Sequence, residues 1–204
     1  MVIVIEPRDS HRYFELIDQM FRLRAKVFSD RLGWDVQVVD GKERDKYDDE
    51  APTYLIYVDD TVRAVKASLR LLPTTGPTLL ADFFWDTRPD AVHLVGPTIW
   101  ECTRFCVNHE VSSENNEADF LITTATMIAA VGKLAIRAGI ESILCNINRT
   151  MLRLCRRAGC EVYVLGSTNR YHEPVYLGLF PISEAILAKV RERLNVQGVE
   201  INAT

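Results

Sequence analysis

The stretch that most constrains the fold of this chain is residues 100–107, which read WECTRFCV. Aromatic, cysteine and β-branched residues without Gly or Pro are typical of a β-strand. Gly96-Pro97 breaks the chain just before it, so the strand is predicted at about 99–107. This mostly apolar strand also carries Glu101 and Arg104, and a buried charge is costly unless it is paired or used. We therefore expect the strand to hold a structural ion pair or to line a site.

The spacing of these two charges predicts an irregular strand. Side chains alternate between the two faces of a strand, so Glu101 and Arg104, three residues apart, would point to opposite faces. A β-bulge within the strand, or a site with walls on both faces, resolves the conflict. Because bulges beside active sites re-aim side chains, this pattern favours a functional strand.

Hydrophobic periodicity and turn residues predict the order of the remaining elements. Strands are predicted at 2–5, 53–58, 62–72, 99–107, 143–147, 161–165 and 175–180, and helices at 11–31, 79–84, 118–138, 149–158 and 182–194. A helix between the strands at 99–107 and 143–147 implies a right-handed parallel crossover. The first strands are predicted to form antiparallel hairpins. The sequence thus predicts one α/β (α+β) domain over residues 1–204, with a mixed central β-sheet and helices on both faces.

Composition narrows the classes of protein. The net charge of −4 argues against a general nucleic-acid-binding surface, and 48% hydrophobic residues suit a globular domain. The five cysteines are odd in number and lack a CxxC pair, which favours reduced thiols in a cytosolic protein. The N-terminus does not resemble a signal peptide, and the apolar run at 120–136 is interrupted by Lys133. We expect a cytoplasmic protein without a membrane span.

Six charged residues stand where a core or a loop lid would not be expected to hold them. They are Arg24, Asp45, Asp48, Arg70, Glu101 and Arg104. Arg24 lies on or beside the apolar face of the first predicted helix, so a buried partner is expected. The acidic loop at 34–51 is long enough to be a functional lid, although a solvated loop is the alternative. Gathered around one cleft, the six charges could keep one another ionised, and a purely structural ion network is the alternative.

Together these residues resemble the LuxI-type acyl-homoserine-lactone synthases. The resemblance extends from about residue 14 to residue 165, in order, spacing and residue type. Its motifs here are Arg24, Phe28 and Trp34, then ERDKYDDEAPTYL with Asp45 and Asp48, LRLLPTTGPTLL with Arg70, then Phe84, and WECTRFCV with Glu101 and Arg104. The resemblance implies an acyltransferase fold related to the GNAT N-acetyltransferases.

The same resemblance implies two substrates. One is S-adenosylmethionine, which is a substrate and not a cofactor, and the other is an acyl thioester on acyl carrier protein or coenzyme A. The products would be an N-acyl-homoserine lactone, which is a quorum-sensing signal, and 5′-methylthioadenosine. No other cofactor and no metal is implied.

The chemistry of these substrates suggests roles for the charged residues. A thioester is already activated, so the amine of S-adenosylmethionine can attack it once a carboxylate takes the amine's proton. Glu101 is the predicted base, because a strand fixes a side chain better than a loop does. The acids Asp45 and Asp48 are predicted to hold the ammonium and sulfonium side. The arginines Arg24, Arg70 and Arg104 are predicted to anchor the substrate carboxylate and hold the acids in place.

Aromatic and strand residues complete the predicted substrate site. Phe28 and Trp34 are expected to cover the sulfonium substrate through a cation–π contact. Phe84, Thr103 and Phe105 are also expected beside the substrates, with core packing as the alternative for Phe28 and Phe84. Backbone N–H groups beside the bulge could bind the thioester oxygen.

The acyl chain needs an apolar pocket, which we assign to Met127, Leu144 and Ile147, although the same residues can serve as core. The strand at 143–147 contains no Thr, and in some relatives a Thr there favours 3-oxo chains. We therefore predict an acyl chain without a 3-oxo group.

A basic helix face is the predicted docking site of the acyl donor. Arg149, Arg153 and Arg157 are spaced one turn apart, and they could meet an acidic acyl carrier protein or the phosphates of coenzyme A. The carrier protein is the predicted donor, and a solvated helix face is the alternative.

Two other functions remain alternatives. A GNAT-like N-acyltransferase using acyl-CoA and another amine would need a Gly-rich loop after the central strand, yet residues 108–117 contain no Gly. A binding domain or DNA-binding regulator agrees poorly with the negative charge and the charges inside strands. Acyl-chain length and branching, oligomeric state and the cognate receptor stay open.

Overall fold

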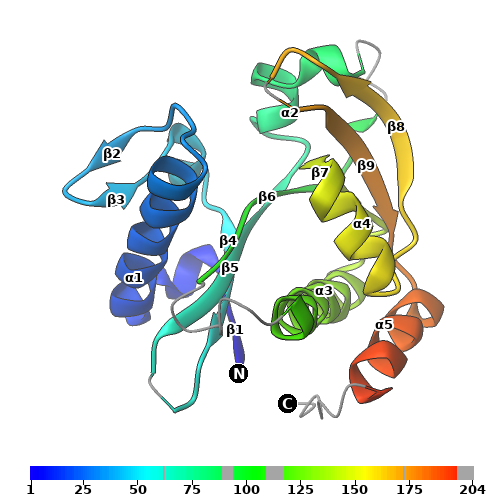
Figure 1. Ribbon diagram of the computed structural model, residues 1–204, viewed down its shortest axis with the longest axis horizontal. Helices are drawn as coiled ribbons and strands as arrows, with labels where there is room; N and C mark the ends of the chain where they lie inside the picture. Colours follow the sequence, from blue (N-terminus) through cyan, green and yellow to red (C-terminus); the bar gives the residue numbers. More distant parts are fainter. Residues whose placement is uncertain (62, 89–93, 109–116, 172, 197–204) are drawn as a thin grey trace.

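The computed structural model describes residues 1–61, 63–88, 94–108, 117–171 and 173–196. Its main sheet has seven strands in the order β1-β4-β5-β6-β7-β9-β8 (Figure 1). The strands are β1 (Val2–Ile5), β4 (Thr53–Val58), β5 (Val65–Pro73), β6 (Ile99–Val107), β7 (Ser142–Asn148), β8 (Tyr163–Thr168) and β9 (Val175–Pro181). Among the described residues of this sheet, β6 and β7 form the one parallel pair, and the other neighbours are antiparallel. The predicted mixed central sheet is confirmed.

Helices cover both faces of the sheet, as predicted (Figure 1). They are α1 (Phe14–Arg24), α2 (Leu79–Asp82), α3 (Glu117–Ala138), α4 (Arg149–Arg157) and α5 (Glu184–Val196). A hydrophobic core lies on each face of the sheet, and β4 contributes side chains to both. Ile56 packs with α1 on one face and its neighbour Leu55 packs with α3 on the other. Helices α4 and α5 join α3 through a further cluster that includes Leu154 and Leu187.

The first predicted helix is divided at the position of Arg24. A 3₁₀ helix, η1 (Pro7–Arg12), precedes α1, and a π-helical segment, η2 (Ala25–Arg31), follows it. A π-helical turn has one more residue in each hydrogen-bonded ring, and such turns are frequent at functional sites. Side-chain periodicity does not report this widening, so a single helix was predicted.

The predicted lid at 34–51 has structure of its own. It contains a short hairpin of β2 (Val38–Val39) and β3 (Lys42–Glu43), then a 3₁₀ helix, η3 (Lys46–Asp49). Asp45 caps η3 with its side chain, and Asp48 binds back to the N–H of Asp45. This reciprocal capping fixes both carboxylates relative to the backbone.

Strands β6 and β7 separate along their length. Their pairing runs from Ile99 opposite Ser142 to Glu101 opposite Leu144. Beyond this point β6 continues to Val107 along β5, and β7 continues to Asn148 along β9. The middle of the sheet therefore splits just after Glu101.

Helix α3 connects β6 to β7. It is long and apolar enough to cross a membrane by length and composition, but half of that stretch is buried inside the protein. Met127 and Val131 face the sheet, and Leu121 and Ala129 belong to the cluster shared with α4 and α5. It packs as the core helix of the parallel crossover.

Candidate active site

The predicted bulge lies in the middle of β6. Arg70 on β5 pairs with Thr103, and Ser68 pairs with Cys106, so two steps on β5 face three on β6. The extra length falls around Arg104, which has a φ of 54°. A left-handed backbone is rare for a residue with a side chain and is common where a strand re-aims one. The bulge lets Arg104 reach the acidic segment that precedes η3.

Arg24 is one of the most deeply buried charges of the site. Its Nη1 and Nη2 donate to the two oxygens of Asp48 at 2.8 and 2.9 Å, and its Nε donates to Glu43 at 2.5 Å. Arg24 is 1% exposed and Glu43 is fully buried. The expectation of a buried partner for Arg24 is confirmed, with two carboxylates in place of one.

Arg70 and Arg104 extend these contacts into a network. The Nη1 of Arg70 donates to Asp45 at 2.5 Å and to Asp48 at 2.8 Å. The Nη2 of Arg104 lies 2.8 Å from Asp45 and 3.0 Å from Glu43. We call these six residues the ion network: Arg24, Glu43, Asp45, Asp48, Arg70 and Arg104. Three positive and three negative charges make it neutral.

The network favours the ionised forms of Asp48 and Arg24. Burial acts to raise the pKa of Asp48, but hydrogen bonds and attraction from Arg24 and Arg70 outweigh it, so that pKa lies well below its usual range. Burial also acts to lower the pKa of Arg24, and Asp48 and Glu43 reverse that effect. Charge compensation therefore makes the burial of these ions tolerable.

Glu101 lies outside the ion network, which corrects the predicted grouping. Its two carboxylate oxygens accept the backbone N–H groups of Leu79 at 2.9 Å and Leu80 at 2.7 Å, in the first turn of α2. Burial raises the pKa of Glu101 to about 7, although these two N–H groups act to lower it. Glu43 occupies the place in the network that was predicted for Glu101.

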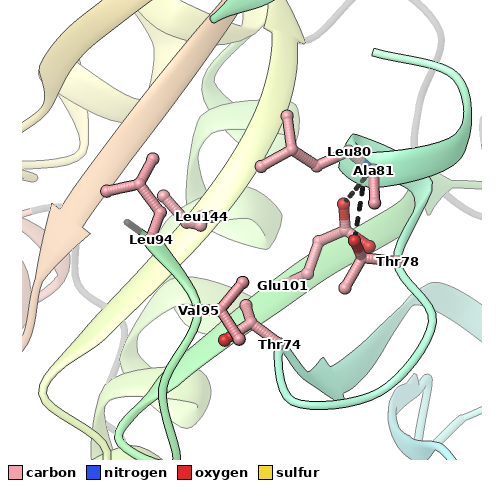
Figure 2. Close-up of a pocket in the computed structure, with 8 residues that line it drawn as sticks. All are labelled: Thr74, Thr78, Leu80, Ala81, Leu94, Val95, Glu101 and Leu144. Carbon is pink, nitrogen blue, oxygen red and sulfur yellow. Dashed lines mark hydrogen bonds between the residues drawn. The ribbon is translucent and has the colours of Figure 1, made fainter. Parts of the chain in front are cut away.

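A cavity of about 260 Å³ adjoins Glu101. Figure 2 shows the Glu101 side chain reaching from β6 toward the first turn of α2. The cavity is lined by Thr74, Thr78, Leu80, Ala81, Leu94, Val95, Glu101 and Leu144. Among these described lining residues Glu101 alone carries a charge, so its carboxylate stands in an apolar setting.

The end of β8 and the loop after it hold the segment that follows α2. Thr168 donates its hydroxyl to Asp86 at 2.7 Å, and Tyr171 donates to the carbonyl of Phe83 at 3.0 Å. At Gly166 an added Cβ would lie 1.9 Å from the Thr87 carbonyl oxygen, so only glycine permits this approach. These contacts hold the segment that follows α2 against β8 and the loop after it.

The predicted aromatic residues occupy different settings. Phe28 is buried and stacks on Trp34 with ring centroids 5.1 Å apart, and the Arg104 guanidinium lies 5.4 Å from the Phe28 centroid. Trp34 is 49% exposed and remains available to a ligand. Phe84 is half-buried against Tyr171.

The two further residues predicted from the strand lie on β6. Thr103 accepts the Nε of Arg70 at 3.0 Å through its hydroxyl. Phe105 packs with the core beneath α3.

The three residues predicted for the acyl chain do not share one face. Leu144 lines the cavity beside Glu101. Met127 is fully buried on the side of α3 that faces the sheet, and Ile147, three residues beyond Leu144, lies on the opposite face of β7 from Leu144 by strand alternation. Their role in binding an acyl chain stays a prediction.

The predicted carrier-binding arginines are exposed on α4. Arg149 and Arg153 follow one helix face, and Arg157 on the same face pairs with Glu117. Residues 108–117, where a GNAT-like N-acyltransferase would need a Gly-rich loop, lie mostly outside the described residues.

Reasoning from sequence missed Glu43, Tyr47 and Asp82. Glu43 resembles its acidic neighbours in the loop, and its burial follows from the two-residue strand β3, which is too short to show a pattern. Tyr47 is buried, and its hydroxyl donates to Asp82 on α2 at 2.7 Å. An aromatic residue between Asp45 and Asp48 was the available signal.

Comparison with known proteins connects this geometry to a family. The autoinducer synthase family matches residues 9–190. An acyl-homoserine-lactone synthase from Rhizobium etli is 36% identical over 179 residues, covering 87% of this chain and 82% of the relative. A synthase from Agrobacterium fabrum is 32% identical over 190 residues, covering 93% and 90%.

Solved structures agree with the sequence relatives. The acyl-homoserine lactone synthase LasI superposes with a TM-score of 0.80 at 26% identity, covering all of this chain and 98% of LasI. BjaI, a CoA-dependent synthase solved with S-adenosylmethionine and isopentyl-CoA, gives 0.81 at 25% identity, covering 96% and 89%. An N-acetyltransferase from Lactobacillus plantarum shares the fold with a TM-score of 0.56. With its GNAT-like sheet, its bulged central strand and these relatives, the chain belongs to the autoinducer synthase family of acyl-homoserine-lactone synthases.

Proposed function

We propose that the chain transfers an acyl group from a thioester to the amine of S-adenosylmethionine, and then closes the lactone with release of 5′-methylthioadenosine. The observation that carries this proposal is Glu101, a buried carboxylate in an apolar cavity beside a neutral ion network. The relative BjaI, solved with S-adenosylmethionine and isopentyl-CoA, supports the pair of substrates.

Glu101 is the proposed general base. A base must be deprotonated before it accepts a proton. With a pKa of about 7, Glu101 loses its own proton as the pH rises through neutrality. The α-amino group at a peptide terminus has a pKa of about 7.7–8.0, so a base like Glu101 and an α-amine of this kind are matched within about one unit. Proton transfer from amine to Glu101 is therefore nearly balanced at the pH of a cell.

The outer members of the ion network are proposed to bind the amino-acid part of S-adenosylmethionine. The side chains of Asp45 and Arg104 are 18% and 11% exposed, whereas those of Arg24, Glu43 and Asp48 are essentially buried. Arg104 can anchor the substrate carboxylate, and Asp45 can hold the ammonium or sulfonium. The buried members, together with Arg70, hold these two in position, and Trp34 covers the ligand.

The split between β6 and β7 is the proposed entry of the thioester. Because pairing ends at Glu101 and Leu144, the reacting carbonyl can lie where the amine approaches from the Glu101 face. The acyl chain then extends to the α3 face, where Met127 and Ile147 lie. Backbone N–H groups beside the bulge are the proposed donors to the oxyanion.

Lactone closure follows acyl transfer. The anchored carboxylate oxygen attacks the carbon next to the sulfonium, that carbon–sulfur bond breaks, and neutral 5′-methylthioadenosine leaves. The reaction needs no further base, so the contribution of the protein is to fold the methionine chain into reach.

Acyl carrier protein is the proposed donor, bound at Arg149, Arg153 and Arg157. Their exposure on α4 supports a surface for an acidic partner. Two solved relatives, BjaI and MesI, are described as CoA-dependent, so acyl-CoA is the donor to test against the carrier protein. We propose a single cytoplasmic synthase domain without a cofactor or a metal.

Glu101→Gln tests the proposal. The amide keeps the shape but cannot accept the proton, so lactone formation and 5′-methylthioadenosine release should both fall by about 10²–10⁴-fold. Glu141→Gln is the matched control, since Glu141 is exposed and is expected to change neither rate. Lactones are identified by mass spectrometry with acyl carrier protein and CoA donors in parallel. Activity of Glu101→Gln within tenfold of the parent, or acyl transfer to another amine without 5′-methylthioadenosine, would refute it.

A further inference from the structure

Helix α2 cannot hold Glu101 in place by its own stability. It has four residues, from Leu79 to Asp82, and an isolated helix of that length does not form in water. Yet its first-turn N–H groups, from Leu79 and Leu80, bind both oxygens of Glu101. The orientation of α2, and with it the setting of Glu101, must come from contacts outside the helix.

One such contact comes from the centre of the acidic segment. Tyr47 lies in η3, between Asp45 and Asp48, and is 1% exposed. Its hydroxyl donates to the Oδ2 of Asp82 at 2.7 Å. The Arg70 guanidinium lies 5.4 Å from the centre of the Tyr47 ring. The ring is thus fixed by the ion network at one end and bound to α2 at the other.

Asp82 is suited to receive this bond. Lys46 lies 2.6 Å from the same oxygen, and the hydrogen bonds from Lys46 and Tyr47 lower the pKa of Asp82. Asp82 is therefore an anion, and its bond to a neutral hydroxyl is charge-assisted. Burial, reinforced by Asp82, raises the pKa of Tyr47 far above the working range, so the hydroxyl keeps its proton.

We propose that Tyr47 is a positioning residue that couples the ion network to Glu101 through Asp82 and the backbone of α2. The inference rests on the proposed role of Glu101 as the base. Because Asp45 and Asp48 flank Tyr47, a substrate held by the network acts on the same rigid turn that orients α2. The residues proposed to bind the amine and the residue proposed to accept its proton are thereby held in a fixed relative position.

The coupling has a direct electrostatic signature. Besides the two N–H groups of α2, Glu101 is influenced by Arg70 on β5, which stabilises its charge, and by Asp45, which opposes it. Tyr47 donates its hydroxyl to Asp82, and the charges of Asp82, Glu101 and Asp45 all act on it. If α2 loosens, the N–H bonds to the carboxylate weaken, the charged form is less stabilised, and the pKa of Glu101 rises.

Tyr47→Phe removes the hydroxyl and keeps the buried ring. Tyr54→Phe is the matched control, because Tyr54 is also buried and its hydroxyl also donates to a carboxylate, but that carboxylate is Asp48 of the ion network and not Asp82 of α2. The pKa of Glu101 is measured in the substrate-free protein by carbon NMR of carboxyl-labelled glutamate, with the signal assigned by its loss in Glu101→Gln. Tyr47→Phe should raise this pKa by at least about 0.5, and Tyr54→Phe should not.

Enzyme kinetics give the second reading. In Tyr47→Phe the acidic limb of the plot of kcat/KM against pH should move to higher pH, by as much as the measured pKa of Glu101 rises. Asp82→Ala, at a partly exposed position, should reproduce both the higher pKa and the shifted limb. The coupling is overturned if the pKa of Glu101 is unchanged in Tyr47→Phe and Asp82→Ala, or if it rises as much in Tyr54→Phe as in Tyr47→Phe. Because the titration needs no turnover, that outcome is distinct from an active Glu101→Gln, which would overturn the proposed base.

Discussion

Replacing Glu43 by Gln should destabilise the protein far more than a single surface charge would. Glu43 is fully buried and joins Arg24 at 2.5 Å to Arg104 at 3.0 Å. With three arginines against three carboxylates the network is neutral, so the amide leaves it with one uncompensated positive charge. Removing one partner from a buried ion pair costs about 3–5 kcal/mol. A domain of ordinary stability, about 5–15 kcal/mol, would lose a large share of it.

Urea unfolding followed by circular dichroism measures this cost. With a slope of about 2 kcal/mol per molar urea, the midpoint should fall by about 1.5–2.5 M in Glu43→Gln. The matched control is Glu117→Gln, which breaks the exposed pair with Arg157 and should cost less than about 1 kcal/mol. If Glu43→Gln unfolds within about 1 kcal/mol of the parent, Glu43 does not compensate buried charge, and the account of the network is wrong.

Three further predictions follow from the site and its supports. The raised pKa of Glu101 means that the folded state holds this proton more tightly than the unfolded chain does, so the stability it contributes is complete below about pH 4.5 and is lost as the pH rises through about 7. Between pH 5 and 8 the free energy of unfolding of the parent, measured in urea, should fall by about 2–3 kcal/mol relative to that of Glu101→Gln. The same pH dependence of stability in both proteins would contradict this prediction. Gly166→Ala should displace the segment at Thr87 and lower both thermal stability and kcat, whereas Gly76→Ala, where an added Cβ would meet its nearest neighbour at 3.9 Å, should be tolerated; equal melting temperatures would show that the close approach is not required. Arg153→Glu should raise KM for acyl carrier protein at low salt by about tenfold or more and change KM for a short acyl-CoA much less, and equal effects on the two donors would argue against a carrier surface on α4.

Local sequence patterns predicted the features that depend on neighbouring residues. The bulge followed from Glu101 and Arg104, because two charges three apart cannot share one face of a regular strand. The same alternation rule applies to Leu144 and Ile147, which are also three apart and lie on opposite faces. The prediction of one pocket for Leu144 and Ile147 did not apply to β7 the alternation rule that had correctly predicted the bulge in β6.

The partners of the charges depend on contacts that local patterns do not carry. Arg24 was expected to have a buried partner, yet Glu43 could not be told from the exposed acids around it, because its burial depends on how the lid folds back. Glu101 was grouped with the arginines by charge. Its actual partners are backbone N–H groups of α2, and every residue except proline has such a group, so residue type gives no signal.

The ion network also limits when this protein can become active. Its members come from residues 24 to 104, on the first helix, the lid, β5 and the bulge of β6, and each buried charge depends on partners from other elements. A nascent chain that has not yet released β6 from the ribosome leaves Glu43 and Asp45 without Arg104. The proposed substrate site is therefore assembled together with the native state, and signal output should depend on the amount of fully folded protein, with no contribution from partly folded chains.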